Sequence, residues 1–568
     1  MAGQTREKRW AKKQYDERAA ARLARELRIS DISAAMLANR GVTDIEAADK
    51  FLYPKLEHLH DPYLMKDMQA AVERIRLAIE RGERICIYGD YDVDGTTSTI
   101  ILKKTLKLLG ADVSYYIPER LKDGYGLRED AMDMAKAEGY QLIISVDTGI
   151  RAQQVVEHAR TLGLDMIITD HHLPEDGSLP RAHAVLNPKR DDCPYPEKNL
   201  AGVGVAFKLA QALLGKDSKR VESFVKVAAI GTIADIVPVV GENRVIAKHG
   251  LAGLRNPVNH GLRALLEVAG VNLNKPLSGM DIGFKVGPRI NAAGRMEKAS
   301  AVIELFDAPD YETARQMALA MNVKNAARQQ VEADTLAAAI RQIDSDSRLK
   351  NSYVAVIAGE NWHRGVIGIV ASKVVERLYR PTIIISVENG IGHGSGRSIP
   401  PFHLLNGLES CAEVFEKFGG HSHAAGVTIR ADKIDELRAR LDAHARGVLR
   451  PEDLIPVIDF DCELSFKQAS LETLEEINRL EPFGAGNPQP VFVTKGAKVV
   501  ERRILKDKHL KLKLMQDGRW MDCVWWGAAE VAQDVYPGDV VSLAYTLSEN
   551  TYNGSTSVQL TLKDLKIQ

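Results

Sequence analysis

Between residues 83 and 188 the chain alternates short apolar runs with longer stretches of helical spacing. These runs do not alternate between apolar and polar residues, as strands of a sheet with one solvent-exposed face do. They therefore fit strands that are buried on both faces of the sheet. Stretches such as 97–109 and 153–162 gather their apolar residues on one helical face. This order predicts a parallel sheet covered by helices on both faces. The predicted strands are 85–88, 113–117, 142–146, 166–169 and 184–186.

Beyond residue 188 the pattern becomes helical and then returns to mixed strand and helix. Segments 203–214 and 221–232 have helical spacing, and 310–344 is rich in Ala, Gln and Arg with few helix breakers. The last of these predicts a long connecting helix. A second α/β unit begins at 353–359 and extends to about residue 447.

The last part of the chain, from about residue 453, changes character. Residues 510–514 alternate strictly between Leu and Lys, and an Asn553-Gly554 pair lies between two further apolar runs. Short alternating strands with Asn-Gly turns are typical of a small β-barrel or sandwich.

Composition limits the class of protein. A chain of 568 residues is too long for one hydrophobic core, and 45% hydrophobic and 27% charged residues are ordinary for a globular protein. The formal net charge is −1, so any nucleic-acid binding must come from local patches.

The five cysteines are scattered singly, which argues against disulfides and zinc and for a reducing cytoplasm. No apolar run approaches a membrane span, and residues 6–28 read as a mixed-charge helix without a signal-peptide core. We therefore expect a cytoplasmic protein with no membrane contact.

Three carboxylates follow the first predicted strand at alternate positions: Asp90, Asp92 and Asp94. Three anions on one short edge repel each other and are costly to bury unless a cation neutralises them. An EF-hand would require a Glu at the twelfth loop position, which is Ile101, and a helix rather than a strand before the loop. The motif instead predicts a divalent-metal site at a strand end.

Other predicted strands end in residues of the same kind. Asp147 follows the third strand, Asp170-His171-His172 follows the fourth, and Asp235 lies in a later helical segment. One such Asp is commonly a helix cap, but independent capping does not explain all of them together, and the carboxyl ends of parallel strands meet at one edge.

This set predicts two Mn2+ or Mg2+ ions, and the mixture of carboxylate and imidazole favours Mn2+. We expect Asp147 to bridge the ions and His172 to face the substrate phosphate, the alternative for His172 being a supporting or core histidine. Asp90 is either a ligand or an acidic neighbour. The candidate metal ligands are Asp90, Asp92, Asp94, Asp147, His171 and Asp235, and the candidate catalytic residues are Asp92, Asp94, Asp147, His171, His172 and Asp235.

These motifs resemble those of the DHH phosphoesterase superfamily: Asp90-x-Asp92-x-Asp94-Gly95, Val146-Asp147-x-Gly149, Asp170-His171-His172 and Ala234-Asp235. The second α/β unit resembles the partner domain called DHHA1. That resemblance rests on Gly394-Ser395-Gly396-Arg397-Ser398 and on 418–426, with its Gly-Gly-His-x-His core. Further segments at 123–127, 200–207, 287–295 and 362–368 resemble the bacterial single-stranded-DNA-specific exonucleases of this superfamily.

The resemblance implies an α/β fold in which a parallel-sheet DHH domain is joined by a long helix to a smaller DHHA1 domain, followed by an OB-fold barrel. It implies a 5′→3′ exonuclease that degrades single-stranded DNA to 5′-mononucleotides with two metal ions. It also suggests work in recombination and repair beside a helicase and a single-strand-binding protein. The expected domains are 1–45 (N-terminal helical segment), 46–270 (DHH), 271–345 (connecting region), 346–450 (DHHA1) and 451–568 (OB-fold).

Candidate substrate contacts lie outside the metal set. The segment Gly394-Ser395-Gly396-Arg397 offers backbone N–H groups, a hydroxyl and a guanidinium, which together suit an anion, although a plain turn would carry the same glycines. Arg120, Arg289 and Asn291 are further candidate phosphate contacts. No carboxylate lies near His421 or His423, so we expect His421 near the substrate and His423 to be structural.

The C-terminal part carries a local basic bias. Between residues 498 and 513 there are seven Lys or Arg residues and two acidic ones, Glu501 and Asp507. A basic face with aromatic residues is how OB-folds hold single strands. The candidate stacking residues are Trp520, Trp525, Trp526, Tyr545 and Tyr552. The alternative is that most of these aromatic residues belong to the barrel core, and at least one of Trp525 and Trp526 must do so.

Other members of the superfamily fit less well. The pyrophosphatase branch has a His four residues before the middle Asp, where Tyr88 stands. Nano-RNases and cyclic-dinucleotide phosphodiesterases lack the basic C-terminal domain. A binding-only scaffold would have lost ligand residues, and here every one is present.

Overall fold

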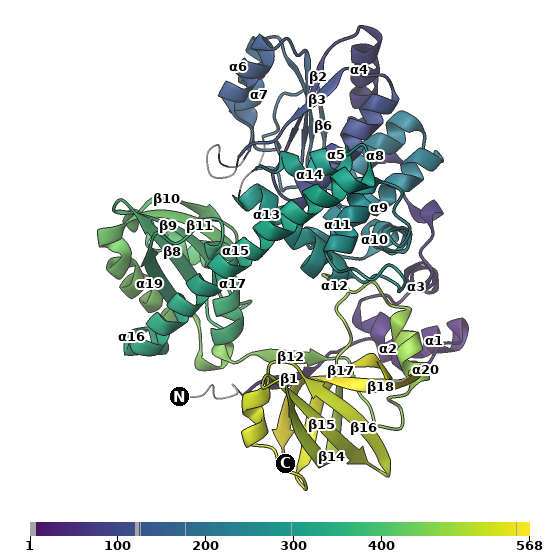
Figure 1. The fold of residues 1–568 in the computed structure, drawn as a ribbon, viewed down its shortest axis with the longest axis vertical. Helices are drawn as coiled ribbons and strands as arrows, with labels where there is room; N and C mark the ends of the chain where they lie inside the picture. Colours follow the sequence, from purple (N-terminus) through teal and green to yellow (C-terminus); the bar gives the residue numbers. More distant parts are fainter. Residues whose placement is uncertain (1–6, 120–123, 125, 176–177, 297, 553) are drawn as a thin grey trace.

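The computed structural model describes residues 7–119, 124, 126–175, 178–296, 298–552 and 554–568. A long helix, α15 (Tyr311–Ser345), runs diagonally from the first α/β domain to the second, and a β-barrel lies at the bottom of the view in Figure 1. None of the described helices is both long enough and apolar enough to cross a membrane.

The first α/β domain contains a fully parallel sheet in the order β3-β2-β4-β5-β6. The strands are β2 (Ile85–Gly89), β3 (Val113–Tyr116), β4 (Leu142–Val146), β5 (Asp165–Thr169) and β6 (Ala184–Leu186). The predicted strands are confirmed to within one or two residues at each end.

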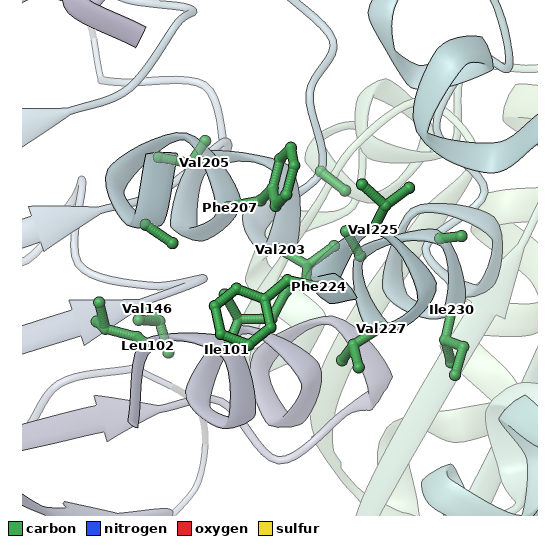
Figure 2. Close-up of a cluster of buried hydrophobic side chains, with 14 of the residues drawn as sticks. Ile101, Leu102, Val146, Val203, Val205, Phe207, Phe224, Val225, Val227 and Ile230 are labelled. Carbon is green, nitrogen blue, oxygen red and sulfur yellow. The ribbon is translucent and has the colours of Figure 1, made fainter. Parts of the chain in front are cut away.

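Alternate residues of these strands pack on opposite faces of the sheet. Ile87 and Ile144 face a core shared with α4, α5 and α8, while Cys86 and Ile143 face α6 and α7. The helices are α4 (Met68–Glu80), α5 (Val93–Leu108), α6 (Glu129–Ala137), α7 (Gln153–Thr161) and α8 (Gly202–Leu214). Figure 2 shows part of the larger core, in which Val146 of the sheet lies beside Leu102 of α5.

A helical region completes this domain. It comprises α9 (Lys219–Ala234), α10 (Gly241–Gly253), α11 (His260–Val268), α12 (Gly279–Asp281), the π-helical turn η3 (Ile282–Val286), α13 (Gly287–Met296) and α14 (Ser300–Phe306). Helices α5, α8 and α9 pack against one another.

The second α/β domain has a mixed sheet in the order β10-β11-β9-β8-β7, in which only β7 and β8 are parallel. Its strands are β7 (Ala355–Glu360), β8 (Thr382–Glu388), β9 (Ile391–Arg397), β10 (Phe415–Gly420) and β11 (Ala424–Arg430). Its helices are α16 (Ser347–Asn351), α17 (Ile367–Leu378), α18 (Leu404–Glu409), η4 (Ala412–Val414), η5 (Ala431–Lys433) and α19 (Ile434–Val448).

The C-terminal strands close into a barrel because β14 pairs with both β15 and β17. The predicted β-barrel is thereby confirmed. Its elements are η6 (Pro451–Leu454), β12 (Val457–Phe460), β13 (Cys462–Glu463), α20 (Leu471–Asn478), β14 (Phe492–Leu505), β15 (His509–Gln516), β16 (Arg519–Trp525), η7 (Ala529–Gln533), β17 (Val540–Tyr552) and β18 (Ser555–Ile567).

The N-terminal segment belongs physically to this barrel domain. The expected helix over 6–28 is wrong at its start, because β1 (Arg9–Lys12) pairs in parallel with β12. Leu23 and Leu37 are buried in the same core as the barrel residues. The helices of the segment are α1 (Glu17–Leu27), α2 (Asp31–Asn39) and α3 (Ile45–Leu52). The short helices that follow, η1 (Leu56–His58) and η2 (Pro62–Leu64), pack instead against α4, α8 and α10 of the first α/β domain. The domain boundaries given above stay predictions.

Candidate metal centre

The turn from β2 to α5 places three carboxylates at the end of the sheet. Asp92 is the N-cap of α5 and accepts a hydrogen bond from the Gly95 backbone N–H at 3.0 Å. A side chain at Gly95 would meet the Asp90 backbone oxygen at 2.5 Å, so glycine allows this tight turn. Asp94, in the first turn of α5, is buried and accepts hydrogen bonds from the backbone N–H groups of Gly202 and Val203 at 2.6 and 2.7 Å. These two donors open α8, so a helix N-terminus steadies the buried anion.

Asp147 and His171 complete the centre from the neighbouring strands. Asp147 follows β4 with a φ of 60°, in the left-handed region. A Cβ at Gly202 would lie 2.7 Å from Asp147 Oδ1, so this glycine leaves room for the carboxylate. The Nε2 atom of His171 is 3.2 Å from Asp147 Oδ1, 3.7 Å from Asp94 Oδ2 and 3.6 Å from Asp235 Oδ2. Asp235 caps the C-terminal end of α9.

Three overlapping groups of potential ligands result. In each, one ligand atom per residue lies within 4.8 Å of the others: Asp94, His171 and Asp235; Asp90, Asp92 and Asp147; and Asp147, His171 and His172. Asp147 Oδ1 is buried and accepts no hydrogen bond within the described chain, so a cation would satisfy it. Taken together, the ligand atoms are mostly carboxylate oxygens with imidazole nitrogen from His171 and His172, a mixture that suits Mn2+ and Mg2+. The residues therefore fit the predicted pair of divalent ions.

The pKa values of the centre show that its buried carboxylates lack a compensating positive charge. Burial, followed by the nearby charges of Asp235 and Asp92, raises the pKa of Asp94 well above its usual value. Burial and the surrounding aspartates do the same for the pKa of Asp147. Burial and Asp92 raise the pKa of Asp235 to about 7. Burial, followed by the charge of His172, lowers the pKa of His171 to about 3, which keeps its imidazole neutral, as a metal ligand must be.

His172 is held differently from His171. Its Nδ1 atom lies 2.7 Å from Oδ1 of the buried Asp170, which also accepts hydrogen bonds from the backbone N–H groups of His171 and His172. Burial lowers the pKa of His172, but the hydrogen bond and the charge of Asp170 raise it, and the net result is a raised pKa. The Asn187 side chain donates to the His172 carbonyl at 2.9 Å. Asp170 and Asn187 are supporting residues that our site prediction omitted; the position of Asp170 in the motif was the available signal.

A cavity of about 1170 Å³ opens beside the centre. Asp170, His172 and Lys189 line it from the first α/β domain, and His421 lines it from the second. The expectation that His421 lies near the substrate region is consistent with this position, while exposed His423 is not among the lining residues. Lys189 was not foreseen from the sequence, since nothing marks it apart from other lysines.

The other candidate phosphate contacts are placed less directly. Arg120 lies outside the described residues. Arg289, in α13, donates to the Asn322 side chain at 3.0 Å and to the Lys285 carbonyl at 2.6 Å, which ties α13 to α15. Asn291 is half-buried in the same helix. A side chain at Gly294 would lie 2.3 Å from the Tyr91 carbonyl, so α13 packs directly against the carboxylate loop.

The expectation that the backbone N–H groups of 394–397 are available to an anion is wrong. These residues form the end of β9, which pairs with β8 and β11, so their backbone groups belong to the sheet. A Cβ at Gly394 would lie 2.6 Å from Val427, so the glycine serves close packing. The Arg397 Nη1 donates to Ser395 Oγ at 3.1 Å and to the Gly396 carbonyl at 2.7 Å, which places the predicted hydroxyl and guanidinium side by side.

The expected alternation of buried Leu and outward Lys is present on β15, where Lys511 also forms an ion pair with Asp522 at 3.5 Å. Leu510, Leu512 and Leu514 are buried while Lys513 points outward beside Trp520, whose ring lies 5.2 Å from the ammonium. Trp520 and Trp526 are 52% and 59% exposed. Tyr545 is fully buried and Trp525 packs against the barrel core, so the alternative interpretation as core is correct for these two.

Comparison with known proteins identifies the family. Family models for the DHH family N-terminal domain, the DHHA1 domain and the RecJ OB domain match residues 84–232, 350–447 and 460–564. The single-stranded-DNA-specific exonuclease RecJ of Bacillus subtilis is 40% identical over 563 residues, covering 98% of this chain and 71% of the relative. The chain belongs to the RecJ family. The RecJ of Escherichia coli is 34% identical and is matched over 88% of this chain and 90% of its own.

Solved structures agree with this assignment. The crystal structure of Thermus thermophilus RecJ in complex with Mn2+ superposes with a TM-score of 0.83 at 29% identity, covering 98% of this chain and 79% of that one. The same protein with Mg2+ gives 0.77 at 27% identity. The predicted DHH, DHHA1 and OB architecture is confirmed.

Proposed function

We propose that this RecJ-family protein is a metal-dependent exonuclease that degrades single-stranded DNA from its 5′ end to 5′-mononucleotides. The observation that carries the proposal is the convergence of Asp94, Asp147 and Asp235 on the neutral imidazole of His171. Asp90 and Asp92 form a second group with the same Asp147. The B. subtilis and E. coli relatives bear the name single-stranded-DNA-specific exonuclease, and both align over most of this chain.

In the proposed mechanism Asp94, His171 and Asp235 would hold one cation, and Asp92 with Asp90 would hold the other. Asp147 is in a group with Asp90 and Asp92 and in a group with His171, so it would be the ligand shared by both cations. When bound, the two cations supply a nucleophile by lowering the pKa of water and neutralise charge on the phosphate. The Gly202 and Val203 amides fix one carboxylate of this set by hydrogen bonding to Asp94.

His172 acts on the substrate side. Asp170 holds its Nδ1 and so orients the ring, and His172 lines the cavity in which the reacting phosphate would lie. A histidine whose pKa is raised by a carboxylate is a good hydrogen-bond donor to phosphate oxygens near neutral pH. Lys189 and His421 line the same cavity and add donors around the departing nucleotide.

Polarity requires a group that recognises a strand end, because the metal centre accepts any phosphodiester. Ser395 and Arg397 suit a terminal 5′-phosphate, which carries more charge than an internal diester and so gains more from a guanidinium. Arg289 and Asn291 on α13 and Arg120 are proposed contacts for the strand backbone. The basic face of the barrel would hold the strand farther from the cut.

The cellular setting follows from the same proposal. A single-strand exonuclease needs a helicase to expose its substrate and meets single-strand-binding protein on it, so we propose these as partners in recombination and repair. Five unpaired thiols and a DNA substrate fit the cytoplasm.

The test compares substrates side by side with Mn2+: long single-stranded DNA, the matching duplex, a short oligoribonucleotide and pyrophosphate. We expect the single strand to be digested fastest, with no pyrophosphatase activity. Faster hydrolysis of pyrophosphate or of the short oligoribonucleotide would replace this proposal with another superfamily activity.

A further inference from the structure

A second pocket lies on the first α/β domain, away from the metal centre. It measures about 410 Å³ and is formed by α5, α9, α11 and α14. Its walls are largely apolar, and Figure 2 shows Ile101, Phe224 and Val227 of this region together in the core between helices. The other apolar lining residues are Ile100, Val258, Leu262, Ile303 and Phe306.

The rim of this pocket is basic. Lys103, Lys104, Lys107 and Lys226 line it, against a single acidic residue, Asp307. Lys103 is already neutralised, because its Nζ lies 2.5 Å from Asp307 Oδ2. Within the described chain Lys104 and Lys107 are exposed and form no ion pair, and Lys226 donates only to the Asn256 carbonyl, at 3.2 Å. A surplus of positive charge thus surrounds the apolar walls, in a chain whose formal net charge is −1.

Two features of the rim do not serve the stability of the fold. Lys104 and Lys107 are three residues apart on α5, where like charges repel each other. Val258 is 88% exposed at the mouth of the pocket, immediately before the N-cap of α11. Val258 extends the apolar walls of the pocket out to its mouth, and contiguous exposed apolar surface rimmed by polar residues is typical of a binding site.

We propose that this pocket docks an acidic segment of a partner protein, with one large apolar side chain inserted between α5 and α9. Carboxylates flanking that side chain would meet Lys104, Lys107 and Lys226. Apolar burial would supply the affinity, and charge would supply the orientation and association rate.

DNA is the less suitable occupant. Phe224 and Phe306 are each only 8% exposed, so the pocket presents no aromatic face on which a base could stack. Its aliphatic walls instead match the side chain of a Leu or a Phe.

The pocket is placed so that a docked partner leaves the metal centre open. Helix α5 carries Asp94 in its first turn, and Lys104 lies ten residues later, about 15 Å along the helix axis. Helix α9 likewise ends at Asp235 and contributes Phe224 from its opposite end. This docking site is independent of the proposed nuclease function.

The test measures binding of a labelled ten-residue peptide, rich in aspartate with one central Phe, by fluorescence anisotropy at low salt. We expect saturable binding to the full-length protein and at least tenfold weaker binding to Lys104→Glu/Lys107→Glu and to Val258→Asp. A peptide with Ser in place of the Phe should also bind at least tenfold more weakly. The matched control is Lys136→Glu/Lys350→Glu, which makes the same charge change on exposed lysines elsewhere and should bind like wild type.

Failure of the peptide to bind, or equal binding to the Lys104→Glu/Lys107→Glu variant, would overturn the proposal. The same variants are also measured with a labelled single-stranded oligonucleotide. A loss of oligonucleotide binding as large as the loss of peptide binding would assign the lysines to DNA and overturn the proposal as well. Unchanged melting temperatures and nuclease rates of the variants show that the fold and the metal centre are intact.

Discussion

The Nε2 atom of His171 lies 3.2 Å from Oδ1 of Asp147, although the two residues follow different strands. Burial keeps this imidazole neutral, and it lies among carboxylates whose pKa values are raised by burial and by one another's charge. A cluster of buried carboxylates destabilises the fold when no cation is present and becomes favourable when cations are bound among them. The centre is therefore built to be completed by metal.

This electrostatic conflict predicts a pH-dependent stabilisation by Mn2+. The folded-state pKa of Asp235 is about 7, above its unfolded value, so in the metal-free protein its stabilising contribution is present at low pH and is lost as pH rises through 7. Bound cations compete with that proton, so Mn2+ affinity should be about tenfold or more weaker at pH 6 than at pH 8. The measurement is the rise in melting temperature on adding Mn2+ to EDTA-treated protein. Equal rises at the two pH values would contradict the assignment of raised carboxyl pKa values to the metal ligands.

Asp170 is predicted to act through His172 rather than through metal. Asp170→Asn removes the charge that orients the ring and should lower kcat about 10–100-fold, as losses of such supporting carboxylates do. The Mn2+ concentration for half-maximal activity should change little, because Asp170 is in none of the ligand groups. Steady-state kinetics over a Mn2+ titration separate the two effects. A large shift in the Mn2+ requirement with kcat unchanged would reverse the assigned role.

The barrel is best tested with surface variants. Deleting residues 453–568 would also expose the N-terminal helices, whose Leu23 and Leu37 share the barrel core. Lys511→Glu/Lys513→Glu should instead weaken binding to long single strands and flatten its salt dependence, by about one unit of slope per lost phosphate contact. Hydrolysis of very short oligonucleotides should be unchanged. Unaltered binding to a long strand would assign the basic face to another role.

We predict that Arg397 binds the terminal 5′-phosphate of the strand. Arg397→Ala should reduce activity on 5′-phosphorylated single strands far more than on 5′-hydroxyl strands, with a loss of about 1.5–3 kcal/mol of charged hydrogen bonding. The rates of wild type and variant are compared on both substrates, and Arg430→Ala, an exposed arginine at the end of β11, is the control. An equal loss on both strand ends would show that Arg397 does not recognise the terminal phosphate.

The metal centre was predictable from the sequence because its geometry is a consequence of sheet topology. Asp92, Asp147 and His171 follow strands that are parallel neighbours, so their carboxyl ends must meet. The supporting contacts of Gly202 and Asn187 depend on how α8 and the loop after β6 pack, and no local pattern encodes that packing.

Non-local pairing explains the predictions that were wrong. The strand Arg9–Lys12 exists because it pairs with Val457–Phe460 at the other end of the chain, and its four residues have no strand pattern of their own. The glycines near Arg397 suggested backbone N–H groups available to an anion. In the fold, Gly394 instead lies in a strand, where the Val427 side chain of the neighbouring strand leaves no room for a Cβ atom. In both cases the deciding contact is distant in sequence.

The most direct test of the account follows a 5′-labelled single strand with Mn2+, using wild type and Asp147→Asn. Wild type should release labelled mononucleotide from the earliest time point. Asp147→Asn should be slower by about 10³-fold or more, because it weakens the ligand shared by both ions, each of which contributes several kcal/mol. Asp217→Asn, an exposed carboxylate, should match wild type. Near-normal cleavage by Asp147→Asn, or labelled internal fragments from wild type, would contradict a two-metal 5′ exonuclease.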